Sequence, residues 1–159
     1  MIMKNFENFK QEIIKRCKKQ LACETEFKRV LESKTFEDLI KVITDNFNWS
    51  CNHKIIDIPL LEEVGSEILN NCNIFFNVSV TTGYLLVGNA TVEAGGNATV
   101  EAWGNATVEA WGNATVKAWG NAYINSQNTI EHKLSDYAIC RYKYENRIVL
   151  SSSSNIETY

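Results

Sequence analysis

The pattern of apolar and polar residues changes its period once along this chain. In the first seventy residues apolar side chains recur three or four positions apart, whereas from Gly88 to Gln127 they alternate with polar ones. The first period is typical of helices, and the second is typical of strands whose side chains alternate between two faces. We therefore expect three segments, which are a helical module at 1–72, a β-structured region at 73–150 and a C-terminal tail at 151–159.

Four helices are expected in the helical module. The first covers residues 5–21, where apolar residues line one face of a charged segment. The second is a short helix around Val30. The third begins after Thr35, a residue type that caps helix N-termini, and carries an apolar face as far as Phe47. Pro59 fits the first turn of the fourth helix, which Gly65 is expected to interrupt.

The alternating region is an octapeptide repeat. Its five copies read GNATVEAG, GNATVEAW, GNATVEAW, GNATVKAW and GNAYINSQ. Within GNATVEAW, residues of one parity are Gly, Ala and Val, whereas the other parity carries Asn, Thr, Glu and Trp. Self-similarity at a fixed short period is the signature of stacked architectures.

Two architectures compete for this repeat. An antiparallel meander would use Gly-Asn as its hairpin turns. Trp103 and Ala106, which flank one such turn, would then share a face, so neither face would be cleanly apolar. A coil that always turns the same way keeps every Val and Ala inside and every Glu and Trp outside. We therefore predict an α+β protein in which a small N-terminal helical module precedes a β-solenoid.

The size of the solenoid turn follows from the length of an octad. Eight residues extend about 26 Å, which is too short for a full turn around a core. Two octads per turn suit a thin core of Ala and Val, whereas three would enclose more volume than these residues fill. Residues 135–142 echo residues 120–127 at a displacement of fifteen. Residues 74–87 and 141–150 are expected to cap the two ends of the stack.

Composition narrows the classes of function. The chain has 159 residues, a net charge of −3 and no dense basic patch, so direct binding to nucleic acid is not expected. It has no apolar run of membrane-spanning length and no signal-peptide core, which predicts a cytoplasmic protein without a membrane association. Its five cysteines form no CxxC pair and are expected to be reduced.

Cys51-Asn52-His53 is the most enzyme-like cluster in the sequence. With Cys17 and Cys23 it offers thiols and an imidazole, the ligands and nucleophiles of zinc and cysteine enzymes. Zinc sites normally have paired ligand spacing, which is missing here. We therefore expect Cys51 and His53 to be ordinary loop and packing residues, and the protein to have no catalytic residues, no metal and no cofactor.

The candidate binding residues come from the outward columns and from the first helix. With two octads per turn, Trp103 and Trp119 stack on one face, while Trp111 lies on the other face above Gly95. Exposed aromatic groups mark interaction surfaces. A cationic stretch on the first helix is a second candidate. The predicted partner-binding residues are Trp103, Trp111, Trp119, Glu101 and Glu109 in the repeats, and Lys15, Arg16, Lys18 and Lys19 in the helix.

Several segments together carry a resemblance to known repeat proteins. They are KTFEDL at 34–39, DNF at 45–47, WSCNHK at 49–54, GYLL at 83–86 and the GNATVEAW octads. The chain resembles octapeptide-repeat proteins of Bacteroidetes genomes and of their phages and mobile elements. By analogy with anti-CRISPR proteins, this resemblance implies a non-catalytic inhibitor that binds a host protein or ribonucleoprotein in the host cytoplasm. A self-assembling structural protein, a homo-oligomer held through its solenoid ends, and a carbohydrate-binding module are the alternatives.

Overall fold

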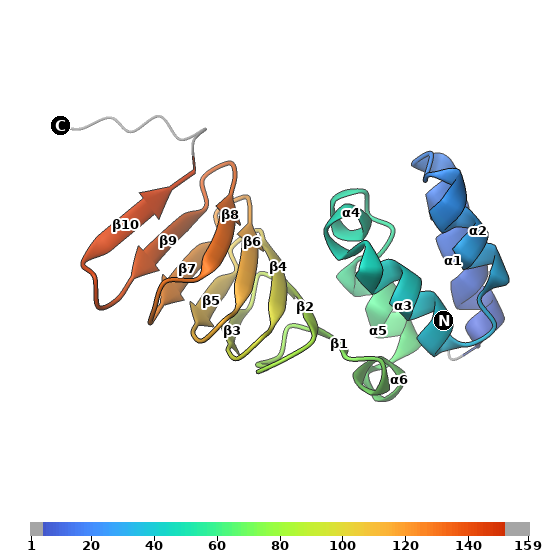
Figure 1. Ribbon diagram of the computed structural model, residues 1–159, viewed down its shortest axis with the longest axis horizontal. Helices are drawn as coiled ribbons and strands as arrows, with labels where there is room; N and C mark the ends of the chain where they lie inside the picture. The colour runs from blue at the N-terminus through green and yellow to red at the C-terminus, as the bar shows by residue number, and fades with distance from the viewer. Residues whose placement is uncertain (1–4, 152–159) are drawn as a thin grey trace. The chain divides into compact units, whose positions relative to one another are not determined.

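The computed structural model describes residues 5–151, which form two compact units (Figure 1). The helical unit ends at Ile74, and the solenoid begins at Phe75. The helices of the first unit are α1 (Phe6–Lys19), α2 (Glu24–Glu32), α3 (Phe36–Asp45), α4 (Phe47–Asn52), α5 (Ile58–Val64) and α6 (Ser66–Asn71).

Short polar side chains cap the N-termini of three of these helices, α1, α3 and α5, and the cap at Thr35 is the one that the sequence predicts. The Thr35 hydroxyl accepts a hydrogen bond from the Asp38 N–H, and the Asp38 carboxylate accepts one from the Thr35 N–H, so the two residues form a capping box. Asp57 caps α5 by accepting from the Leu60 N–H. Gly65, at a φ of 95°, separates α5 from α6 and confirms the expected interruption.

The predicted third helix is wrong in one respect, because it is two helices. The α-helical conformation stops at Asp45, and Phe47 begins α4 instead of extending α3. Between them, the side-chain amide of Asn46 donates to the Val42 carbonyl and to the Glu26 carboxylate. Asparagine is unfavourable in helix interiors because its side-chain amide forms hydrogen bonds with backbone groups that compete with those of the helix.

The solenoid consists of two sheets between which the chain alternates, except that its first two strands belong to one sheet and its last two to the other (Figure 1). Sheet A has the order β1-β2-β4-β6-β8, and sheet B has the order β10-β9-β7-β5-β3. The strands are β1 (Ile74–Phe76), β2 (Tyr84–Gly88), β3 (Thr91–Ala94), β4 (Thr99–Trp103), β5 (Thr107–Ala110), β6 (Thr115–Ala118), β7 (Tyr123–Ser126), β8 (Glu131–Leu134), β9 (Ile139–Tyr142) and β10 (Arg147–Leu150).

The strand register confirms two octads per turn. Val92 pairs with Val108, and Val100 pairs with Val116, in each case sixteen residues apart in parallel strands. The side chains of Val, Ala and Ile in these columns are buried and form the solenoid core. The inward assignment of the apolar parity is therefore correct, and the meander is excluded.

One solenoid turn does contain fifteen residues instead of sixteen, but it is the first turn, and not the last one as the sequence predicts. Leu85 pairs with Val100, which makes the first turn one residue short. In the last turn Ile124 pairs with Cys140, sixteen residues later, so the predicted displacement of residues 135–142 is wrong. The physical reason is the turn. Asp136 adopts a left-handed conformation there and accepts a hydrogen bond from the Gly120 N–H one turn earlier, which fixes the longer register.

Glycine and asparagine have different roles at the corners of the solenoid. Glycine, for which positive φ is not strained, takes this conformation at most corners, and a Cβ at Gly112 would lie only 3.0 Å from the Gly96 nitrogen. The following asparagines stack in register. Asn113 donates to Asn97 at 3.4 Å on one corner, and an equivalent side-chain bond lies on the other. Among the asparagines that follow glycine in the octads, only Asn89 itself has a left-handed backbone.

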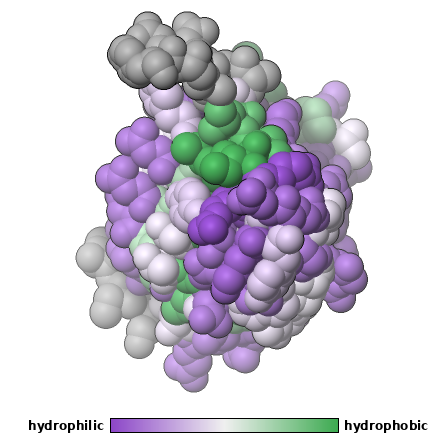
Figure 2. All heavy atoms as spheres, turned by 90° about the vertical axis from the view of Figure 1, so that its left-hand side faces the viewer, coloured by the Kyte–Doolittle hydropathy of each residue, from purple (hydrophilic) through white to green (hydrophobic). Residues whose placement is uncertain are grey.

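The C-terminal end of the solenoid is closed by an antiparallel strand. β10 pairs with β9 in this orientation, unlike the parallel strands of the repeats. The guanidinium of Arg147, the first residue of β10, lies 4.0 Å from the centre of the buried Tyr142 ring of β9. Figure 2 looks onto this side and shows an apolar area among hydrophilic residues, and Ile148 of β10 is 63% exposed.

Candidate functional site

Trp103 and Trp119 form an aromatic pair on the outer face of sheet A. Trp103 is the last residue of β4, Trp119 follows β6, and each precedes a Gly-Asn corner, one turn apart. Their ring centroids are 5.5 Å apart and their planes differ by 15°. Both side chains are half-buried. The pair therefore presents one continuous aromatic surface that remains accessible, in the place that the repeat period predicts.

Glu101 lies on the same outer face but is not a surface residue. Its side chain is 0% exposed, and among the described residues neither carboxylate oxygen has a hydrogen-bond partner. Burial raises the pKa of Glu101 to about 7, an effect that the charge of Lys117 in the neighbouring strand opposes. Glu101, which the sequence analysis includes among the partner-binding residues, is therefore not accessible to a partner in this structure. Its neighbours in register are the equally buried Leu86 in β2, which is not a repeat residue, and the half-buried Lys117 in β6.

Trp111 lies on the outer face of sheet B and packs over Gly95, as predicted. A Cβ at Gly95 would overlap the Trp111 ring, so this glycine makes the packing possible. The ring also borders a hollow of about 370 Å³, together with Phe75, Val80, Glu93 and hydroxyl side chains from residues 79–82. Trp111 therefore contributes both to packing and to a concave surface.

Glu93 and Glu109 form a column of carboxylates on the outer face of sheet B. They are paired in adjacent parallel strands, sixteen residues apart, as two octads per turn require. Glu109 is half-buried, and the Asn125 amide donates to both of its carboxylate oxygens at 2.9 Å. Glu109 is one of the predicted partner-binding residues, and its carboxylate already accepts hydrogen bonds from Asn125 in the same column.

The cationic stretch on α1 divides into structural and exposed residues. Arg16 forms ion pairs with Glu12 and Asp57, each at 2.9 Å, and therefore ties α1 to the start of α5. Its hydrogen bond to Glu12 is the main reason why the pKa of that carboxyl is lowered. Lys15 lies beside the same carboxylate at 3.1 Å. Lys18 and Lys19 are exposed and are the cations of this stretch best placed for an external partner.

Cys51 and His53 occupy packing positions. Cys51 is buried in α4. The His53 ring stacks on Trp49 at 4.5 Å, and its Nδ1 lies 3.0 Å from the Trp49 carbonyl oxygen. In the part of the chain from 5 to 151, no three His, Cys, Asp or Glu side chains are grouped so that they could hold a metal ion.

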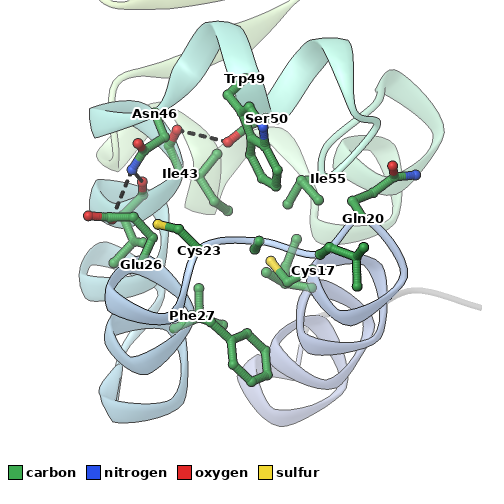
Figure 3. Close-up of a pocket in the computed structure, with 15 residues that line it drawn as sticks. Cys17, Gln20, Cys23, Glu26, Phe27, Ile43, Asn46, Trp49, Ser50 and Ile55 are labelled. Carbon is green, nitrogen blue, oxygen red and sulfur yellow. Dashed lines mark hydrogen bonds between the residues drawn. The ribbon is translucent and has the colours of Figure 1, made fainter.

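The helical unit contains a cavity that the sequence did not reveal. It has a volume of about 400 Å³ and lies between the end of α1, α2, α3 and α4 (Figure 3). Sequence patterns assign Ile13, Val30 and Ile43 to a packed core, and they are indeed buried, but they also line this space. Leu21 continues the apolar spacing of α1 in the sequence, but in the structure it lies at the rim of the cavity, 88% exposed and in a left-handed conformation.

Comparisons with protein families, curated proteins and solved structures gave no match to this chain. The fold itself defines the class: a two-sheet β-solenoid of octapeptide repeats that follows a unit of short helices. Within residues 5–151, no helix combines the length and the apolar character that crossing a membrane requires.

Proposed function

We propose that this chain is a non-catalytic binding protein whose solenoid engages a large macromolecular partner in the cytoplasm. The observation that carries the proposal is the accessible pair of Trp103 and Trp119. The resemblance to repeat proteins of phages and mobile elements makes a host protein or ribonucleoprotein the first partner to test, with inhibition as the outcome of binding.

The physical argument rests on the contact that such a pair offers. Tryptophan is enriched among the residues that dominate binding energy, because a large rigid ring buries much area at little entropic cost. Here the two rings are already stacked at 5.5 Å, so binding would not have to order them. Lys117 and Lys133 follow one another along the next column of sheet A and place positive charge beside the aromatic surface.

Affinity capture from the lysate of a host cell tests the proposal. The bait proteins are the wild type, a Trp103→Ala/Trp119→Ala double variant and a Trp111→Ala control, which removes the repeat tryptophan of the opposite sheet. Captured proteins and nucleic acids are quantified by mass spectrometry and sequencing. Light scattering on each bait gives its mass.

A defined partner that the wild type and W111A retain, and that the double variant loses at least about tenfold, would support the proposal. A partner retained equally by the double variant would move the binding site away from sheet A, and the exposed Lys18 and Lys19 would be the next residues to change. A wild-type oligomer that captures nothing would favour self-assembly. A monomer that captures nothing would remove both functions.

The hollow at Trp111 favours carbohydrate binding as a second candidate function. It combines an aromatic ring with the Ser79, Thr81 and Thr82 hydroxyls and the Glu93 carboxylate. Sugar rings stack on aromatic faces, and their hydroxyl groups need several polar partners. In a glycan-binding assay, loss of binding in W111A but not in the Trp103→Ala/Trp119→Ala variant would support this function. No binding by the wild type would exclude it.

A further inference from the structure

The cavity of the helical unit has an apolar floor and a polar side. Figure 3 shows the Trp49 indole extending toward Ile55 and Cys17, while Glu26 and Asn46 lie together at one side of the opening. Ile55 is 2% exposed, and Cys17 is 4% exposed. Burial raises the pKa of the Cys17 thiol, which therefore stays neutral and adds to the apolar floor.

The unused hydrogen-bonding atoms on the polar side are acceptors. The Asn46 amide nitrogen donates to Glu26 Oε2 at 2.9 Å and to the Val42 carbonyl at 3.1 Å, which uses both of its hydrogens. Arg29 donates to the same Glu26 oxygen at 2.7 Å. Among the described residues, the second oxygen of Glu26 and the side-chain oxygen of Asn46 have no hydrogen-bond donor. Both side chains are partly exposed and line the cavity, so a bound molecule that carries a donor can form a hydrogen bond with either of them.

The charge of Glu26 does not call for a cationic ligand, because Arg29 already compensates it. Arg29 also pairs with Asp45, and Asp45 in turn pairs with Lys41, so charges of both signs alternate along this side. A charged ligand would lose its hydration against the apolar floor without gaining an unpaired counter-ion. An uncharged ligand avoids this cost.

We propose that the helical unit binds a compact, uncharged, apolar molecule that carries a hydrogen-bond donor, such as a bicyclic aromatic N–H or O–H compound. Its body would occupy the floor at Ile13, Ile43 and Ile55, and its donor would face Glu26 and Asn46. The cavity of about 400 Å³ lies in the range that is typical of small-molecule sites. This site is independent of the tryptophan pair of the solenoid.

Calorimetric titration of the full chain with indole tests the site, and indene serves as the control ligand because it has the same ring frame without the N–H. The blocking variant is Cys23→Trp, which changes an exposed rim residue that makes no capping hydrogen bond. The control variant is Leu31→Trp, which changes an exposed residue of the same helix outside the cavity lining. If Cys23→Trp does not fold, wild-type protein alkylated at Cys23 takes its place.

The expected result is stoichiometric binding of indole to the wild type and to L31W, with affinity at least about tenfold lower for C23W and for indene. Equal affinity of C23W and the wild type would overturn the site. Equal affinity of indene and indole would overturn the requirement for a donor. Absence of heat and of thermal stabilisation with saturating indole would overturn the whole proposal.

Discussion

Replacement of Glu101 by Gln should stabilise the solenoid at alkaline pH. Glu101 is fully buried, and its carboxylate accepts no hydrogen bond from the described residues. A buried charge without a hydrogen-bonded partner is costly, and the Lys117 charge in the next strand only partly offsets that cost. Gln has almost the same shape but no charge, so E101Q removes the charge and leaves the packing intact.

The shift of the pKa gives the size of the effect. Burial raises the pKa of Glu101 from 4.5 to about 7, which corresponds to about 3 kcal/mol at ~1.4 kcal/mol per unit. Between these values the folded protein holds a proton that the unfolded chain has lost, so stability falls as pH rises through this window. The full cost is present above pH 7. We expect E101Q to be more stable than the wild type by about 2–3 kcal/mol at pH 8 and by less than about 1 kcal/mol at pH 5.

Urea unfolding at the two pH values, followed by tryptophan fluorescence, measures this difference. Glu93→Gln is the matched control, because Glu93 has the same place in its octad but is exposed. Its stability should stay within about 0.5 kcal/mol of the wild type at both pH values. An E101Q protein that is no more stable than the wild type at pH 8 would refute the reasoning. An equal gain in E93Q would attribute the effect to the net charge of the chain instead.

Two further substitutions test the packing of the repeats. Val108→Asp places a charge in the fully buried core column and should cost at least about 3 kcal/mol of stability, with loss of the β-sheet circular dichroism. The control Thr107→Asp, on the outer face, should keep that signal. Native circular dichroism in V108D would contradict the inward assignment of this column. Gly95→Ala forces a methyl group into the Trp111 ring and should cost about 1–3 kcal/mol in thermal unfolding. The same change in a Trp111→Ala background should cost much less, and an equal cost there would show that backbone strain is the cause.

The tryptophan positions were predictable because they depend on the repeat alone. Once the turn holds two octads, Trp103 must lie over Trp119 and Trp111 over Gly95, and both pairs are found. The cavity of the helical unit was not predictable. The spacing of Ile13, Val30 and Ile43 indicates which helix faces turn inward, but it does not determine how closely three helices approach one another.

The three glutamates of the octads show which features the sequence determines and which features depend on the tertiary structure. Local alternation of side chains placed all of them in outward columns, because a strand has a period of two and the octad is even. Their environments nevertheless differ: Glu93 is exposed, Glu109 is held by Asn125, and Glu101 is buried beside Leu86. The octads of Glu101 and Glu109 are identical, and that of Glu93 differs only in its last residue. Only the strands and side chains packed around each copy can therefore make one carboxylate a surface group and another a buried acid.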